Sequence, residues 1–288
     1  MKNTLDCIIR QTYRNLEIIV SDDCSPEKST LTIAQEYAKR DPRIKVYIQD
    51  KNLGAAKNIE FVLMESTGKY FMWADDEDLC ANNLIEKCMH YLVKDSSVVL
   101  CASDLQVIDV QDKIIQTVQH NKIRSPCDWQ KTRKIFFQYP TSSVFYCYCG
   151  VYHSETLKRT GTSDLLGWKK YAINDEVPFL AKIATFGKIV AIPEVLKTYR
   201  MNPNSLYHRE ISTISKIDWL ILRFTIRIRL FKIAYQSNFS LVEKISIYSE
   251  IITSGVKGFI RLQLGNINRI APRLKNSIKK RMPQRYKT

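Results

Sequence analysis

The sequence is poor in the residues and motifs that mark many enzyme classes. It has only four histidines among 288 residues, and none stands in an H-E-x-x-H arrangement, so a metalloprotease-type zinc site is excluded. G-x-G-x-x-G and G-x-x-x-x-G-K-[ST] are absent, which argues against dinucleotide and P-loop nucleotide sites. G-x-S-x-G is also absent, so the chain lacks the nucleophile turn of an α/β-hydrolase.

Long apolar runs and paired cysteines are missing as well. No segment approaches the roughly 18 consecutive apolar residues that a membrane-spanning helix needs. No apolar core of a signal peptide is found in the opening MKNTLDCIIRQTY. The eight cysteines include no C-x-x-C and are scattered through apolar stretches, a pattern typical of buried thiols in a reducing compartment. We therefore expect a cytoplasmic protein.

Positive charge is abundant but unevenly distributed. The chain has 44 Lys and Arg against 29 Asp and Glu, a net charge of +15. Residues 206–288 hold 17 basic and 4 acidic residues, whereas residues 1–205 hold 27 and 25. The hydrophobic content of 45% is that of an ordinary globular protein. We predict a nearly neutral domain over residues 1–205 and a basic helical tail over residues 206–288.

Apolar runs rich in β-branched residues alternate with helical periods at the start of the chain. Strands are predicted over residues 16–21, 44–48, 70–74 and 97–102, and helices over residues 3–12, 30–40, 55–65 and 83–93. Such alternation indicates an α/β fold with a mostly parallel sheet. In these sheets ligands bind beyond the carboxyl ends of the strands.

Two of the predicted strands end in acidic residues. Asp22 and Asp23 follow the first strand, and the run Asp75–Asp78 follows the third. Carboxylates at one edge of a sheet repel one another unless they share a cation. Oxygen ligands favour Mg²⁺ or Mn²⁺, with a substrate phosphate completing the coordination. Solvated turn residues are the alternative interpretation, with equal weight for Asp22 and Asp23 taken alone.

Three segments, QTYRNLEIIVSDDCS, NLGAAKN and GKYFMWADDED, stand in an order and spacing that resemble family 2 glycosyltransferases. The resemblance covers roughly residues 3–205. It implies a GT-A fold, with a mostly parallel sheet flanked by helices, a nucleotide-sugar donor and a divalent cation, Mn²⁺ or Mg²⁺. The implied reaction is inverting transfer of the sugar to an acceptor hydroxyl.

The resemblance also assigns donor-binding roles. It carries Asp23, beside Asp22, to the position that holds the nucleobase, Asp75 to the ribose and Asp76 to the metal. Carboxylates accept hydrogen bonds from a base or a ribose, and a metal on the diphosphate neutralises the leaving group. Lys57 stands where the family often has Arg and would pair with phosphate or base. An exposed helix lysine is the alternative for Lys57.

A second acidic motif of the family resembles Asn174–Ala181, and its carboxylate would act as general base on the acceptor. The match favours Glu176, but Asp175 is adjacent and the sequence does not separate the two. Acids in the first turn of a helix are also favoured by the helix dipole, so a helix start is the alternative. Cys149–His153 is similar to a family strand near the acceptor side, for which we expect core packing.

Two departures from the family pattern weigh on activity. The family begins with a strand and a Pro-x-Tyr-Asn-type loop before the equivalent of Thr4, whereas this chain starts at Met1 within the first predicted helix. We therefore expect half of the base pocket to be missing. Either translation begins upstream of Met1, or the chain is a truncated product. Tyr199–Ser205 resembles a late motif that often has His where Asn202 stands. The alternative function is a catalytically impaired relative that only binds sugar or membrane.

The basic tail interleaves charged with apolar residues. A helix over Ile214–Tyr235 has charges too frequent for a membrane span, yet too much apolar surface for a free helix. A second helix over Leu241–Leu264 and the basic end Arg269–Lys287 follow. Basic amphipathic helices bind anionic membranes; packing onto the domain or in a dimer is the alternative. We expect peripheral attachment at the inner face of the cell membrane and a sugar or lipid-linked acceptor in surface polysaccharide assembly. Nucleic acid is not expected, because no nucleic-acid-binding motif is present.

Overall fold

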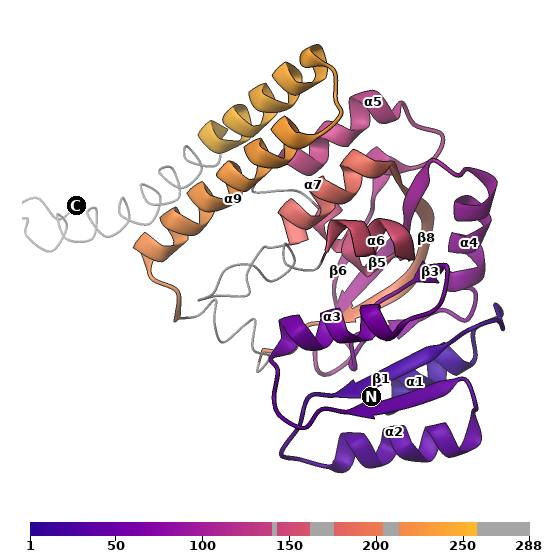
Figure 1. Ribbon diagram of the computed structural model, residues 1–288. Coiled ribbons are helices and arrows are strands. Elements are labelled where there is room, and N and C mark those ends of the chain that lie inside the picture. The colour runs from indigo at the N-terminus through magenta and orange to yellow at the C-terminus, as the bar shows by residue number, and fades with distance from the viewer. Residues whose placement is uncertain (140–142, 162–175, 204–212, 258–288) are drawn as a thin grey trace, which may run out of the picture.

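The computed structural model describes residues 1–139, 143–161, 176–203 and 213–257. Within these residues the strands form two sheets (Figure 1). The smaller sheet pairs β1 (Ile18–Asp22) with β2 (Ile44–Ile48) in parallel. The larger sheet has the order β3 (Tyr70–Phe71), β7 (Val151–His153), β5 (Val98–Ile108), β8 (Lys188–Arg200) and β4 (Leu79–Cys80), with β6 (Ile114–Val118) paired to β5.

The expected parallel arrangement is confirmed for the four strands that the sequence predicts, because β1 pairs in parallel with β2, and β3 and β5 run in the same direction. In the larger sheet β3, β5 and β8 run one way, while the pairs β3–β7, β5–β7, β5–β6 and β4–β8, which the sequence did not predict, are antiparallel. β5 and β6 are joined by a tight turn around Asp112, whose φ is 63°, and strands joined by so short a connection must be antiparallel. β1 and β3 belong to different sheets, so the acidic residues that follow them do not lie at the edge of one common sheet.

The predicted helices at the start of the chain are confirmed within a few residues. They are α1 (Lys2–Ile9), α2 (Ser29–Arg40), α3 (Ala55–Glu65) and α4 (Leu84–Lys94). Each follows its apolar period: α2, for example, buries Leu31, Ala34 and Tyr37 on one face. α1 and α2 cover the small sheet, and their apolar residues form one cluster with Ile18 and Ile44.

Helices cover both faces of the larger sheet (Figure 1). α4 packs on one face, where Leu84 and Cys88 meet Val98 and Val190. The other face carries the main core with α6 (Ser154–Thr160) and α7 (Glu176–Phe186). α7 is buried over most of its length because its sequence, EVPFLAKIATF, is apolar nearly all round. The expected core strand at Cys149–His153 is confirmed, since β7 is buried there.

The described part of the tail packs on the same core. α9 (Lys216–Gln236) buries Leu222, Ile226, Leu230 and Ala234, and residues 241–257 form a second helix beside it (Figure 1). No helix in the described ranges is long and apolar enough to cross a membrane. The boundary predicted after residue 205 falls within residues 204–212, and the basic end Arg269–Lys287 also lies outside the described residues.

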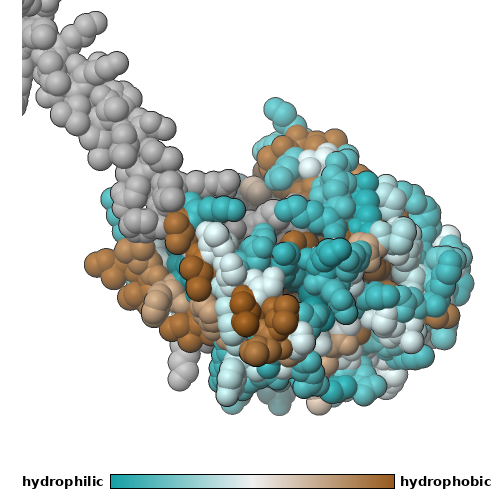
Figure 2. All heavy atoms as spheres, turned by 90° about the horizontal axis from the view of Figure 1, so that it is seen from above, coloured by the Kyte–Doolittle hydropathy of each residue, from teal (hydrophilic) through white to brown (hydrophobic). Residues whose placement is uncertain are grey.

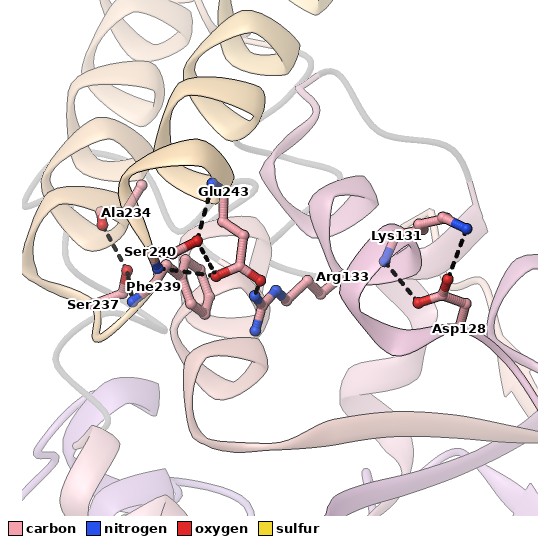
Figure 3. A network of polar contacts seen from close by, with 8 residues as sticks. All are labelled: Asp128, Lys131, Arg133, Ala234, Ser237, Phe239, Ser240 and Glu243. Carbon is pink, nitrogen blue, oxygen red and sulfur yellow. Dashed lines mark hydrogen bonds and ion pairs between the residues drawn. The ribbon is translucent and has the colours of Figure 1, made fainter.

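A polar network anchors the turn between the two tail helices (Figure 3). Glu243 accepts a hydrogen bond from the Arg133 guanidinium, which follows the short helix α5 (Trp129–Thr132). The backbone N and Oγ of Ser240 each donate to Glu243 Oε2 at 2.9 Å, which caps the second helix. The Arg133 guanidinium also lies 4.0 Å from the centroid of the Phe239 ring. The tail is thus held to the domain by charge as well as by apolar packing.

Candidate functional site

Asp23 is bound to the backbone of the turn that starts α3. Its Oδ1 accepts a hydrogen bond from Leu53 N at 2.7 Å, and its Oδ2 accepts one from Gly54 N at 2.9 Å. Gly54 has φ 84°, which only glycine adopts without strain. The carboxylate therefore shapes this turn, and each oxygen keeps one further lone pair with which it could accept from a ligand.

The neighbours of Asp23 that the sequence singled out have different surroundings. Asp22 is buried at the end of β1, where its Oδ2 accepts from Ser25 N at 3.2 Å. Lys57 is exposed on the first turn of α3. Sequence reasoning missed the contact that places this turn: Ser21 Oγ donates to Asn58 Oδ1 at 2.6 Å. Asn58, the second asparagine of NLGAAKN, was the signal that could have indicated this contact.

In the acidic run after β3, the side chains of Asp75, Asp76 and Glu77 are exposed. Thr4 Oγ1 of α1 donates to the carbonyl oxygen of Asp76 at 2.8 Å, which fixes the backbone and leaves the Asp76 carboxylate exposed. Asn202 Nδ2 donates to Glu77 Oε1 at 3.0 Å. The late motif that contains Asn202 therefore contacts the acidic run.

Asp78 turns inward and forms a buried ion pair. Lys197 Nζ of β8 lies 3.4 Å from Asp78 Oδ2, and the two side chains are only 7% and 4% exposed. Burial raises the pKa of Asp78 to about 6, against the opposing effect of Lys197. Burial opposes the charge of Lys197, but Cys149 and Asp78 outweigh it and raise the pKa of this lysine. Lys197, which the sequence analysis missed, thus ties the acidic run to the large sheet.

Tyr148 contacts the first acidic motif and lies within electrostatic range of the second. Its hydroxyl donates to Asp75 Oδ2 at 3.5 Å. Burial raises the pKa of Tyr148 well above its usual range, and the charges of Asp75 and Glu176 raise it further. Glu176 is the half-buried first residue of α7. The phenol of Tyr148 therefore contacts the end of β3 and is affected by the charge at the start of α7, whereas Asp175 lies outside the described residues.

Two thiols lie behind the acidic run. Cys7 Sγ of α1 is 3.2 Å from Cys80 Sγ of β4. The hydrogen bond with the Cys80 thiol lowers the pKa of Cys7 to about 7, although burial opposes this. Both thiols, together with Thr4, Asp78 and Lys197, line a small cavity of about 10 Å³. The remaining cysteines are also free thiols, and Cys88, Cys101, Cys147 and Cys149 are buried.

The residues of the acidic run suit a cation that is shared with a substrate. In the part of the chain that the structure describes, no three His, Cys, Asp or Glu side chains converge on one point. Asp75 and Asp76 are neighbouring exposed carboxylates. Mg²⁺ is typically held by one or two carboxylates, with substrate phosphates and waters completing its shell. The residues thus fit a metal bound together with a diphosphate and do not fit a protein-only cage.

Comparisons of the sequence with known proteins identify a family. Residues 1–161 match the model of Glycosyl transferase family 2. An uncharacterized glycosyltransferase of Haemophilus influenzae is 28% identical over 219 residues, which are 74% of this chain and 66% of that protein. A putative teichuronic acid biosynthesis glycosyltransferase, TuaG of Bacillus subtilis, is 30% identical over 96 residues, 33% of this chain and 38% of TuaG.

Comparisons with solved structures concern the fold. S. aureus TarS in complex with UDP superposes with a TM-score of 0.61 at 14% identity, over 87% of this chain and 66% of that one. The mannosyltransferase PcManGT of Pyrobaculum calidifontis, in complex with GDP-Man and Mn²⁺, gives 0.53 at 18% identity, over 86% and 64%. The chain thus spans about two thirds or less of the length of all four proteins. It belongs to glycosyl transferase family 2 and has the GT-A fold that the sequence predicts.

Proposed function

We propose that the chain transfers a sugar from a nucleotide-diphosphate donor to an acceptor hydroxyl with inversion at the transferred carbon. The observation that carries this proposal is the hydrogen bond from Tyr148 to Asp75, together with the charge of Glu176 that acts on the same phenol. A donor site and a general base must lie close together for direct transfer. The UDP bound to TarS and the GDP-Man bound to PcManGT support a nucleotide-sugar donor.

Asp76 would hold Mn²⁺ or Mg²⁺ against the donor diphosphate, and Asp75 would accept a hydrogen bond from the ribose. When bound, the cation neutralises charge that develops on the departing diphosphate. The chain itself holds the run in place through the hydrogen bond from Thr4 to the Asp76 carbonyl oxygen and through the Asp78–Lys197 pair two residues later. Asp23 would accept from the nucleobase while it keeps its two backbone contacts, and Lys57 would pair with phosphate.

Glu176 would remove the proton from the acceptor hydroxyl. Glu176 stands in the first turn of α7, where the helix dipole is positive. Inversion requires this base on the side opposite the leaving group. Asp175 remains the alternative base.

The acceptor that we propose is a sugar or a lipid-linked sugar in surface polysaccharide assembly. Similarity to TuaG, whose name refers to teichuronic acid biosynthesis, supports this class of product. A cytoplasmic enzyme at the inner face of the membrane would meet such acceptors where they are made.

Calorimetry tests the donor site. UDP or GDP should bind only in the presence of Mn²⁺ or Mg²⁺, and Asp76→Asn should abolish this binding because it removes a charged ligand. Glu36→Gln, a change of an exposed acid on α2, should leave binding unchanged. Metal-independent binding of equal strength in Asp76→Asn would refute the assignment of Asp76.

Transfer kinetics test the base. Glu176→Gln should leave donor binding nearly intact and lower nucleotide release in the presence of acceptor by roughly 10²–10⁴-fold, the usual contribution of a general base. An equal loss in Asp175→Asn alone would move the role by one residue. If both variants keep full activity, the acidic pair only starts the helix.

A further inference from the structure

α9 is apolar on two opposite faces. The inner face carries the buried residues at every fourth position, from Leu222 to Ala234. Exposed apolar residues recur three or four positions apart over the whole helix: Ile217, Leu220, Ile221, Phe224, Ile228 and Tyr235. At 3.6 residues per turn these fall on one line, opposite the buried one. We call this line the outer stripe; Ile217 is 69% exposed in it and Phe224 67%.

Basic residues border the outer stripe on both sides. The helical period places Lys216 and Arg223 along one border, and Arg229 and Lys232 along the other. Lys216 and Lys232 are exposed, and the two arginines are half-buried. Long basic side chains can lay their methylene stems along apolar surface and still place their charge at its edge.

The acidic side chains of the described tail have partners of their own. Asp218 pairs with Ser215 at the start of α9. Glu243 binds Arg133, and Glu250 Oε2 accepts from Gln138 Nε2 at 2.9 Å. These acids cap a helix or dock the tail on the domain. The helical period places Asp218 on the border of Arg229 and Lys232, so the borders of the outer stripe are basic beyond the first turn of α9.

The second tail helix adds exposed apolar surface. Among residues 241–257 the side chains more than half exposed include Leu241, Val242, Ile245, Ile252 and Val256. Figure 2 shows hydrophobic atoms gathered on the left side of the molecule, next to the grey chain. Exposed apolar surface on this scale is typical of a site that binds a partner or a membrane.

We propose that the outer stripe of α9, with the exposed apolar residues of the second helix, binds the surface of an anionic lipid bilayer. The apolar side chains would enter the boundary between headgroups and acyl chains, and the basic borders would contact the lipid phosphates. The combination of an apolar stripe with basic borders favours a bilayer over a second copy of the chain as the partner. Two such stripes packed face to face would bring like charges together. Binding rests on this surface and does not depend on the proposed transfer reaction.

Co-sedimentation of the full chain with vesicles tests the surface. The protein should sediment with vesicles of phosphatidylcholine and phosphatidylglycerol and much less with phosphatidylcholine alone. Phe224→Glu should weaken binding at least about tenfold, since an apolar ring that would enter the bilayer is replaced by a charge that the anionic lipid repels. Val93→Glu on α4 is the matched control, because Val93 is also 67% exposed, and it should bind as the unchanged protein does.

A second pair of variants separates charge from apolar contact. Lys232→Gln should weaken binding about fivefold, the effect of one basic residue at an anionic surface. Lys39→Gln, at an exposed position on α2, should have no effect. Far-ultraviolet circular dichroism should show that each variant remains folded, since all these side chains are exposed.

Four outcomes would overturn the proposal. They are failure of the unchanged protein to sediment with anionic vesicles, undiminished binding by Phe224→Glu, an equal loss in Val93→Glu, and a dimer that Phe224→Glu dissociates without any vesicle binding. Sedimentation needs no turnover. A protein that binds vesicles but transfers no sugar would therefore refute the proposed function alone, and an active protein that ignores vesicles would refute this inference alone.

Discussion

The Asp78–Lys197 pair allows a quantitative test of what holds the acidic run. Lys197→Met keeps the length and the apolar stem of the side chain but removes its charge, which leaves the carboxylate of Asp78 buried without its partner. Breaking a buried ion pair on one side costs about 3–5 kcal/mol. For a chain of this size that corresponds to a fall in Tm of about 10 °C.

The matched control is Lys87→Met, the same substitution in a pair on the surface. Lys87 and Glu194 are 34% and 49% exposed, so their ion pair should contribute less than about 1 kcal/mol. In the double variant Asp78→Asn/Lys197→Met the loss should be smaller than the sum of the two single losses, because no buried charge remains. Urea unfolding of the unchanged protein, the double variant and the single variants Lys197→Met, Asp78→Asn and Lys87→Met measures these differences. If Lys197→Met lowers the free energy of unfolding no more than Lys87→Met does, the Asp78–Lys197 pair does not hold the acidic run in place.

Two further predictions concern a buried histidine and the thiol pair. Burial lowers the pKa of His120 from 6.5 to about 4, so between these values the unfolded chain binds a proton that the folded chain does not. As pH falls through this window the protein should therefore lose up to ~3 kcal/mol relative to His120→Gln, and a constant difference in urea unfolding would contradict this. Hydrogen peroxide should oxidise the Cys7 thiol to a sulfenic acid. The sulfur of Cys80 should then attack the sulfur of Cys7, and the hydroxyl group should leave as water with the Cys80 proton, which forms a Cys7–Cys80 disulfide. Peptide mapping should detect this link before any that involves the buried Cys88, and the opposite order would count against the contact.

The sequence predicted the parts of the fold that depend on local periodicity. The helices of the first hundred residues lie where their apolar spacing placed them, because one buried face decides each of them. The direction of the later strands was not predictable in the same way. β6 and β7 follow the segments from which the parallel sheet was inferred, and their antiparallel pairing results from connections whose path the spacing does not show.

The candidate site was predictable where it rests on motifs and not where it rests on single residues. Asp75, Asp76 and Glu176 stand in recognisable acidic segments. Lys197 and Tyr148 stand in no such motif, and a buried lysine is rare enough that sequence alone gives no reason to expect one. Only the three-dimensional arrangement brings them to the acidic run.

The packing of α9 against α7 has a geometric consequence for the reaction. Packed helices have axes about 8–10 Å apart, so α7 would lie one helix layer above any surface on which α9 rests. The first residue of α7 is Glu176. The tail would then act as a spacer of fixed thickness that sets the height of the proposed base above the bilayer, and only acceptors whose hydroxyl reaches that height would be glycosylated.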